Sequence, residues 1–214
     1  MTARVFASLV LPKHHPRRAD RIGDDRVEAV ERADGSLAFL VADGATGSGE
    51  GWRASGILAD AFLREGPSLS GAFQWADFLA EADGAVRSEL KGWADTTGIA
   101  LSLEGNEIHG ASAGDSMAYL VGDAGWTEIT AKQARKPRIG NFADPIPFIL
   151  EIREARWLVA ATDGLWDQAL QGDIRGVVEK AEDPGRLVQS LLDHVVEFND
   201  GYLRDDFGVL AVRL

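Results

Sequence analysis

The sequence predicts an α+β fold in which antiparallel sheets are covered by helices. Strand-like and helix-like runs follow one another in groups rather than in regular alternation, which disfavours a parallel sheet. Asp34-Gly35, between the second and third strand-like runs, is a hairpin signal. Of the 214 residues, 45% are hydrophobic, which is enough for the core of a single domain spanning residues 1–214.

The first part of the chain is predicted to form three strands, over residues 3–11, 25–32 and 36–43. Basic residues follow the first apolar run, whereas a signal peptide carries them before it, so we interpret this run as a strand. Residues 51–66 place apolar side chains on one helical face, and a second helix is expected near residues 75–90.

The second half of the chain is predicted to return to strands and then to helices. A meander of three strands is expected over 97–105, 106–114 and 116–125, followed by an irregular, basic, proline-containing stretch over 130–148. A buried strand over 155–164 ends at an Asp and precedes two helices, the clearer of which covers 184–199. Residues 204–214 close the chain as a strand.

Charge and composition exclude several classes of function. The net charge of −12 argues against a nucleic-acid-binding surface and against docking on an anionic membrane. The absence of cysteine excludes disulfides, thiolate metal sites and Cys nucleophiles, and it is consistent with the cytoplasmic location that we expect. No run approaches the ~18 apolar residues of a membrane span.

Acidic residues recur where the predicted strands begin or end. These residues are Asp24-Asp25, Asp43, Asp115, Asp163 and Asp205-Asp206. Carboxylates that meet at one rim of a sheet repel one another unless a cation compensates them, and oxygen ligands without His or Cys favour Mg²⁺, Mn²⁺ or Ca²⁺. Asp and Gly are also ordinary turn residues. The pattern alone therefore leaves both a metal site and a set of turns open.

Five segments, in order, resemble the motifs of the PP2C-type (PPM) metal-dependent protein Ser/Thr phosphatases. They are IGDDRVEAV, FLVADGATGSGEGWRAS, IHGASAGDSMAYLV, WLVAATDGLWD and RDDFGVLAV. The fourth is very close to the family's pattern, and together the five cover nearly the whole chain from Asp24 onward. Any one of these segments would be a weak signal, but five in the family's order make the resemblance specific.

The resemblance implies an αββα sandwich of two stacked antiparallel sheets flanked by helices. It also implies a centre of two Mn²⁺ or Mg²⁺ ions between the sheets, with a weaker third ion. Asp43 matches the carboxylate that bridges both ions, and Gly44 matches the residue whose carbonyl binds one of them. The other matched positions are Asp25, Asp163 and Asp205 as metal carboxylates, Asp115 for the third ion, and Asp24 and Asp206 beside the ligands.

The activity implied is hydrolysis of phosphoserine and phosphothreonine on proteins by a water activated between two divalent cations. Such a bacterial-type signalling enzyme opposes a Ser/Thr kinase, and its partner is a phosphorylated protein. The family's phosphate-binding Arg has no direct match, because Asp20 stands at its position and is also an alternative to Asp25 as the metal carboxylate. Arg21 is the candidate for this clamp and Arg18 the alternative, unless both belong to a solvated basic patch.

The stretch between Asp115 and Asp163 is short, so the family's substrate-contacting flap is expected to be reduced, around residues 130–150. Its basic cluster either attracts phosphorylated or acidic substrates near the cleft or is a charged, solvated loop; it comprises Lys132, Arg135, Lys136 and Arg138. The displaced Arg and the small flap support an alternative function, a catalytically weak or inactive PP2C-like module that acts in binding or sensing. The sequence carries no signal for an oligomeric state.

Overall fold

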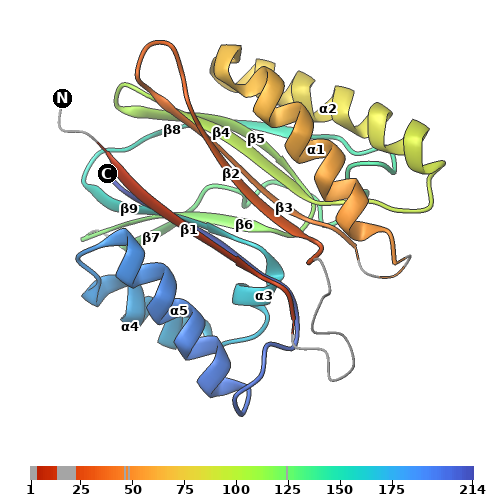
Figure 1. Cartoon of the computed structure of the whole chain (residues 1–214). Coiled ribbons are helices and arrows are strands. Elements are labelled where there is room, and N and C mark those ends of the chain that lie inside the picture. Colours follow the sequence, from red (N-terminus) through yellow and green to blue (C-terminus); the bar gives the residue numbers. More distant parts are fainter. Residues whose placement is uncertain (1–3, 14–22, 46, 48, 124) are drawn as a thin grey trace.

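Two five-stranded antiparallel sheets lie face to face between two groups of helices in the computed structural model, which describes residues 4–13, 23–45, 47, 49–123 and 125–214 (Figure 1). One sheet has the strand order β1 (Val5–Leu11), β10 (Phe207–Arg213), β9 (Ala155–Ala161), β6 (Met117–Gly122) and β7 (Gly125–Glu128). The other has the order β2 (Asp25–Glu31), β3 (Leu37–Asp43), β4 (Gly98–Glu104), β5 (Glu107–Ala113) and β8 (Ile146–Glu151). The predicted α+β class and αββα layering are confirmed.

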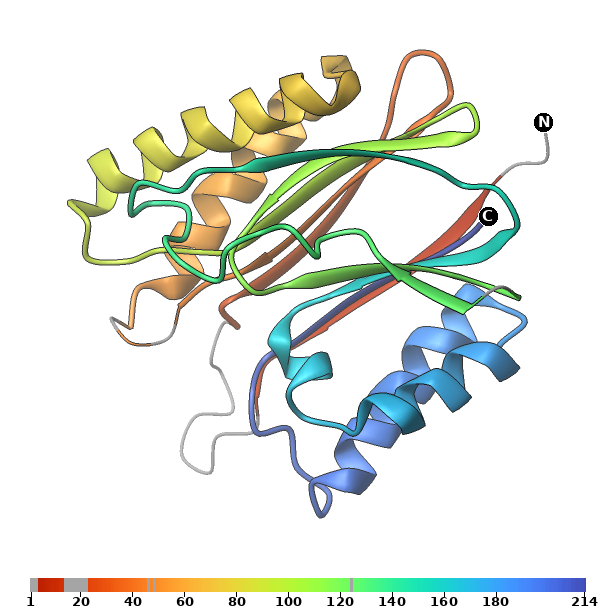
Figure 2. The same ribbon diagram turned by 180° about the vertical axis from the view of Figure 1, so that it is seen from behind.

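Each sheet carries its own helices on its outer face (Figures 1 and 2). The β2-containing sheet is covered by α1 (Gly51–Glu65) and α2 (Gly71–Leu90), which are joined by the 3₁₀ turn η2 (Gly66–Ser68). The β1-containing sheet is covered by α3 (Asp163–Trp166), α4 (Gln171–Lys180) and α5 (Pro184–Phe198). None of the described helices is long and apolar enough to cross a membrane.

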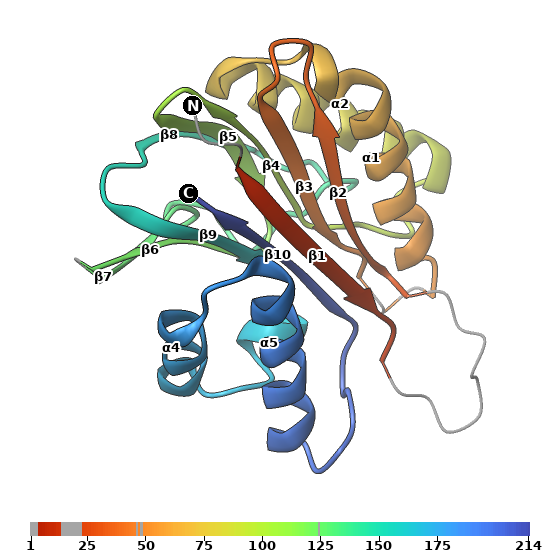
Figure 3. The ribbon, with the colours of Figure 1, turned by 60° about the vertical axis from the view of Figure 1, so that its left-hand side comes forward.

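The central strands are buried on both faces, because each separates two layers of the core. In β3, Leu40 contributes to the core beneath α1 and α2, while Phe39 and Val41 pack between the sheets. In β10, Val209 packs against the helices and Leu210 against the opposite sheet. The period-2 alternation of a strand thus supplies two hydrophobic cores at once. Figure 3 shows these layers with β1 in front.

Most predicted elements are confirmed, with three differences. Residues 146–148 were expected to be irregular but open the strand β8, which pairs with β5. This strand tolerates Pro147 because it lies at the edge of the sheet, where one row of N–H groups needs no partner. The short edge strand β7 was also not predicted. Three helices rather than two follow β9. The additional helix, α3, is a single turn of four residues, which is too short to show a helical pattern in the sequence.

The hairpin predicted at Asp34-Gly35 is confirmed, and its register brings the first acidic positions together. Gly35 adopts a positive φ of 77°, which glycine accepts without strain. From this turn the β2–β3 ladder runs to a final pair in which Asp25 lies opposite Asp43. The two carboxylates therefore reach the same rim of the sheet, although 18 positions separate them in the sequence.

Candidate metal centre

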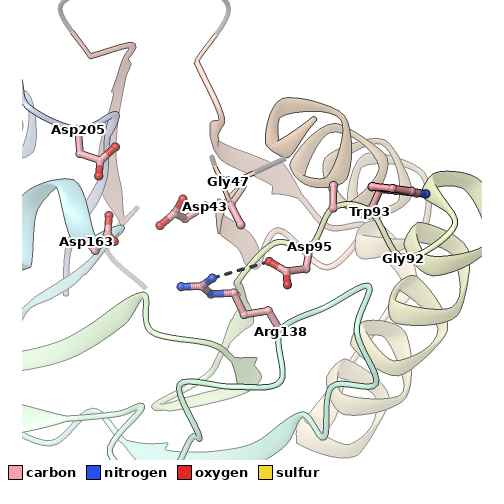
Figure 4. A pocket seen from close by; sticks show the side chains of 10 residues that line it. Asp43, Gly47, Gly92, Trp93, Asp95, Arg138, Asp163 and Asp205 are labelled. Carbon is pink, nitrogen blue, oxygen red and sulfur yellow. Dashed lines mark ion pairs between the residues drawn. The ribbon is translucent and has the colours of Figure 1, made fainter. Parts of the chain in front are cut away.

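Three of the predicted metal carboxylates line one cavity of about 310 Å³. Asp43 comes from the end of β3, Asp163 from the start of α3 and Asp205 from the segment before β10. Figure 4 shows their side chains directed toward a common space. The remaining lining residues are Ala45, Gly47, Gly92, Trp93, Ala94, Asp95 and Arg138. The cavity thus lies where strand ends of both sheets meet.

Asp25 lies behind this cavity and is almost completely buried, with 1% of its surface exposed. The Thr162 hydroxyl, from the opposite sheet, donates a hydrogen bond of 2.7 Å to Asp25 Oδ2. The same hydroxyl accepts the Gly208 N–H at 3.0 Å, and the Thr162 N–H donates to the Gly208 carbonyl at 3.0 Å. Asp25 is therefore held by the end of β9 and the start of β10, and it connects the two sheets.

Gly44 and Gly51 allow helix α1 to begin against the end of β3. A Cβ on Gly44 would overlap the carbonyl group of Gly51, and a Cβ on Gly51 would lie 2.6 Å from the carbonyl oxygen of Gly44. Glycine is thus required at both positions for backbone to approach backbone this closely. The Asp43 carbonyl is fixed in turn by the Thr97 N–H at 2.8 Å and by the Thr96 hydroxyl at 2.9 Å.

Asp206 is a structural residue that holds the segments on both sides of residues 14–22. Its Oδ1 accepts the Lys13 N–H at 2.7 Å, and its Oδ2 accepts a short hydrogen bond from the Asp24 N–H. Neighbouring Asp205 pairs with Lys13 Nζ at 3.2 Å. Asp24 and Asp206 thus lie beside Asp25 and Asp205 in the chain, and their role beside the metal ligands stays a prediction.

The predicted phosphate clamp falls outside the residues that the structure describes. Arg21, its alternative Arg18, and Asp20 all belong to residues 14–22. Their roles stay predictions.

Three carboxylates of the site, Asp25, Asp43 and Asp163, have raised pKa values. Burial, together with repulsion from Asp163 and Asp205, raises the pKa of Asp43 to about 8. Burial and repulsion from Asp205 raise the pKa of Asp163 to about 6. The pKa of Asp25 also lies well above its usual value, chiefly because of burial and then because of Asp43. The nearby cations Lys13 and Arg138 therefore compensate the clustered negative charge only in part.

The donor set suits a hard divalent cation. The acidic donors are carboxylate oxygens, and no His or Cys lines the cavity among the residues described. Within that same part of the chain, no three acidic or imidazole side chains are gathered tightly enough to form a ready-made metal cage. The carboxylates surround the space that an ion would occupy and would have to close on it.

Asp115, the residue expected to hold a third ion, is engaged by arginines. Arg138 donates to both of its carboxylate oxygens, at 3.0 Å from Nη2 to Oδ2 and at 3.3 Å from Nε to Oδ1. Arg135 Nε lies 3.5 Å from Oδ2. A guanidinium thus engages the carboxylate to which the resemblance assigns the weaker ion.

Gly164 is the glycine on which the geometry of Asp163 depends most. A Cβ at this position would overlap the carbonyl oxygen of Asp206. We expect Gly164→Ala to lower the free energy of unfolding by about 3 kcal/mol or more, because rigid backbone must move. Gly176→Ala, in an open position of α4, is the matched control and should stabilise by about 0.5–1 kcal/mol. Urea denaturation measures both; equal stability of the two variants would contradict the close packing.

Comparisons with known proteins place the chain in a family. The sequence model of the Stage II sporulation protein E (SpoIIE) family matches residues 33–214. The chain belongs to the SpoIIE family. This family is PP2C-like, so the predicted relationship to the PP2C-type phosphatases is confirmed. No curated protein matches the sequence.

Solved structures confirm the fold of this SpoIIE-family chain. A bacterial serine phosphatase bearing an R161A mutation has a TM-score of 0.85 at 14% identity, covering 97% of each chain. The serine/threonine phosphatase Stp1 from Staphylococcus aureus has a TM-score of 0.83 at 14% sequence identity, and the match covers 98% of this chain and 95% of Stp1. The Mycobacterium tuberculosis serine/threonine phosphatase PstP/Ppp has a TM-score of 0.80 at 18% sequence identity, and the match covers 99% of this chain and 98% of PstP/Ppp. At sequence identities this low, the similarity to these structures concerns the fold alone. It includes β2 and Asp25, which lie before the residues 33–214 that the family model matches.

Two charged residues that line the cavity, Arg138 and Asp95, were not identified as site residues from the sequence. Arg138 was one of the four basic residues that we hypothesised to attract phosphorylated or acidic substrates near the cleft, and the pattern did not distinguish it from the other three. Asp95 follows no strand, so the strand-end signal does not apply to it. Its Oδ1 is buried and, in the described part of the chain, makes only an ion pair of 3.7 Å with Arg138 Nη1.

Proposed function

We propose that this SpoIIE-family chain is a metal-dependent protein phosphatase that hydrolyses phosphoserine and phosphothreonine. The observation that carries the proposal is the cavity in which Asp43, Asp163 and Asp205 meet from both sheets, with Asp25 buried behind them. We further propose that residues 1–214 form one phosphatase domain whose flap is reduced to part of the 130–150 region, since β8 occupies 146–151.

Asp25, Asp43, Asp163, Asp205 and the Gly44 carbonyl would hold two Mn²⁺ or Mg²⁺ ions. The fit rests on oxygen donors alone and on raised pKa values that show an unmet demand for positive charge. Support comes from a related fold, the catalytic domain of PstP, which was crystallised in complex with 2 manganese ions. When bound, two such ions acidify a water and neutralise charge on the phosphoryl oxygens.

The chain's own residues hold and surround this centre. Thr162 orients Asp25, and Asp206 fixes the backbone beside it. Trp93, whose surface is 77% exposed, lies at the cavity and offers an aromatic contact for a protein substrate. The proposed partner is a phosphorylated protein in the cytoplasm, with a Ser/Thr kinase acting in opposition.

Metal-dependent turnover tests this function directly. We expect hydrolysis of p-nitrophenyl phosphate and of phosphoserine or phosphothreonine peptides with Mn²⁺ or Mg²⁺ and none with EDTA. Asp163→Asn should lower kcat/KM more than the roughly 10–100-fold that follows loss of a residue supporting a metal ligand. Asp193→Asn, on α5, is the control for loss of one carboxylate and should keep full activity.

Two outcomes would contradict the proposal. Full activity of Asp163→Asn would remove this carboxylate from the centre. Absence of metal-stimulated turnover, with a folded protein that still binds Mn²⁺, would favour the inactive binding or sensing module.

A further inference from the structure

One guanidinium enters a cavity that is otherwise acidic. The charged groups among the described residues that line it are four carboxylates and Arg138. Figure 4 shows the guanidinium between Asp95 and the space faced by Asp43 and Asp163. A phosphoryl dianion that enters this cavity therefore meets Arg138 as the positive group supplied by these residues.

The backbone that carries Arg138 is held firmly. Ile139 and Thr96 exchange two hydrogen bonds of 2.9 Å, and Thr96 forms a second isolated bridge with Gly44. The next turn is fixed by Asp83, whose Oδ1 accepts the Gly140 N–H at 2.8 Å and the Ala143 N–H at 3.0 Å. The position of Arg138 relative to Asp43-Gly44 is thus set by a short backbone ladder.

The guanidinium is oriented but keeps donor capacity. Nε and Nη2 are engaged by Asp115, whereas Nη1 lies 3.7 Å from Asp95, which is longer than a hydrogen bond. In the described structure, the N–H groups of Nη1 are therefore free to bind a ligand in the cavity. The Arg138 side chain is 19% exposed, whereas that of Arg135, which pairs with the same Asp115, is 72% exposed.

Electrostatics explains why a phosphatase site of this composition needs such a group. The carboxylates that would hold two divalent ions offset much of the charge of these ions, so the ions alone would compensate a phosphate dianion only in part. A guanidinium supplies that charge, and its planar fork matches two phosphate oxygens. An arginine already aligned by a buried carboxylate loses little side-chain freedom when the phosphate binds.

We infer that Arg138 binds the substrate phosphoryl group directly, and that Asp115 positions Arg138 for this contact instead of holding a third ion. The inference rests on the proposed phosphatase function and names a phosphate-recognising residue of the same site. An arginine of the loop between β7 and β8 would thus bind the phosphate, a role that the family resemblance led us to expect for Arg21 or Arg18. The four basic residues of this loop therefore have different surroundings. Arg138 enters the cavity, whereas Lys132, Arg135 and Lys136 are exposed.

Binding of inorganic phosphate to the Mn²⁺-loaded protein tests the inference. Isothermal titration should show that Arg138→Ala weakens phosphate binding about 10–100-fold, as expected for hydrogen bonds between charged groups. Arg138→Lys should recover only part of this loss, because a point charge cannot form the fork. Arg135→Ala, which removes the exposed partner of Asp115, should change phosphate affinity less than roughly twofold to threefold.

The positioning role of Asp115 has its own readout. Asp115→Asn should weaken phosphate binding when Arg138 is present and should add no further loss in the Arg138→Ala background. A residue that merely stabilised the fold would weaken binding in both backgrounds.

The outcomes separate the inference from the function on which it rests. Unchanged phosphate affinity in Arg138→Ala would overturn the inference even if the wild type hydrolyses phosphopeptides. A parallel loss of Mn²⁺ affinity in both Arg138 variants would also overturn it, because Arg138 would then support the fold or the metals. Arg138-dependent phosphate binding without any turnover would support the inference and refute the proposed function.

Discussion

Asp43→Asn is expected to stabilise the metal-free protein and to remove its response to Mn²⁺. The Asp43 carboxyl is buried and repelled by Asp163 and Asp205, so its charged form is costly without a cation. An amide of the same shape removes this repulsion, and it also removes the ligand expected to bridge two ions. We expect a higher thermal midpoint in EDTA, little further increase with Mn²⁺, and a loss of kcat/KM greater than the roughly 100-fold typical of a supporting residue.

Asp34→Asn is the matched control for this variant, because Asp34-Gly35 is the same dipeptide in a turn remote from the cavity. The Asp34 side chain accepts hydrogen bonds from the Ser36 N–H and hydroxyl, and Asn retains the turn. Its midpoint should rise with Mn²⁺ as much as that of the wild type. A metal-free Asp43→Asn protein less stable than the wild type, or one that still gains stability from Mn²⁺, would contradict the assignment of Asp43.

The metal-free protein is expected to lose stability as the pH rises from about 4 to about 8. Asp43 and Asp163 have raised pKa values in the folded state, about 8 and about 6, against an ordinary value of 3.8 for an Asp carboxyl. The folded state therefore binds more protons than the unfolded state within this window, and the free energy of unfolding falls with increasing pH. A difference of one pKa unit between the folded and unfolded states corresponds to about 1.4 kcal/mol, so the free energy of unfolding should fall by on the order of several kcal/mol across this window.

Urea denaturation at pH 5 and pH 8, with EDTA or with Mn²⁺, measures this effect. With EDTA the protein should be clearly less stable at pH 8, and with Mn²⁺ the difference should shrink or reverse, because the ion favours the ionised carboxylates. Asp43→Asn should flatten the dependence in EDTA. A metal-free wild type that is equally stable at both pH values would show that the carboxylates do not repel one another as described.

The carboxylates could be predicted from the sequence because each is tied to a local signal. Asp43 and Asp163 follow apolar runs and precede a glycine, and Asp205 stands before the last strand. The pattern located each carboxylate at a strand end. Asp43 ends a strand of one sheet, and Asp163 and Asp205 flank strands of the other, so their meeting in one cavity depends on the stacking of two sheets that the family resemblance implied. The continuous apolar runs of β3 and β10 similarly indicated buried strands, and both strands are buried along almost their whole length.

Arg138 and Asp115 show what the local pattern cannot contain. Asp115 carried the same strand-end signal as the other carboxylates, and its pairing with a guanidinium depends on a loop that begins 15 residues later. The strand β8 was missed for a related reason. Its pairing with β5 and its edge position are properties of the assembled sheet, and they make Pro147 acceptable.

Short segments of the sequence encode the α+β class, the family resemblance and the acidic strand ends, because apolar runs, turn glycines and strand-end carboxylates are local features. Tertiary packing, in contrast, buries Asp25 against Thr162, lets Asp206 hold backbone on both sides of residues 14–22, and brings Arg138 into the cavity. These arrangements join segments separated by 20 to more than 190 positions, and only the packing of two sheets brings such segments into contact. The glycine-rich loop that follows Asp43 is evident in the sequence. The reason for two of its glycines, the close contact between the backbones of Gly44 and Gly51, is visible only in the fold.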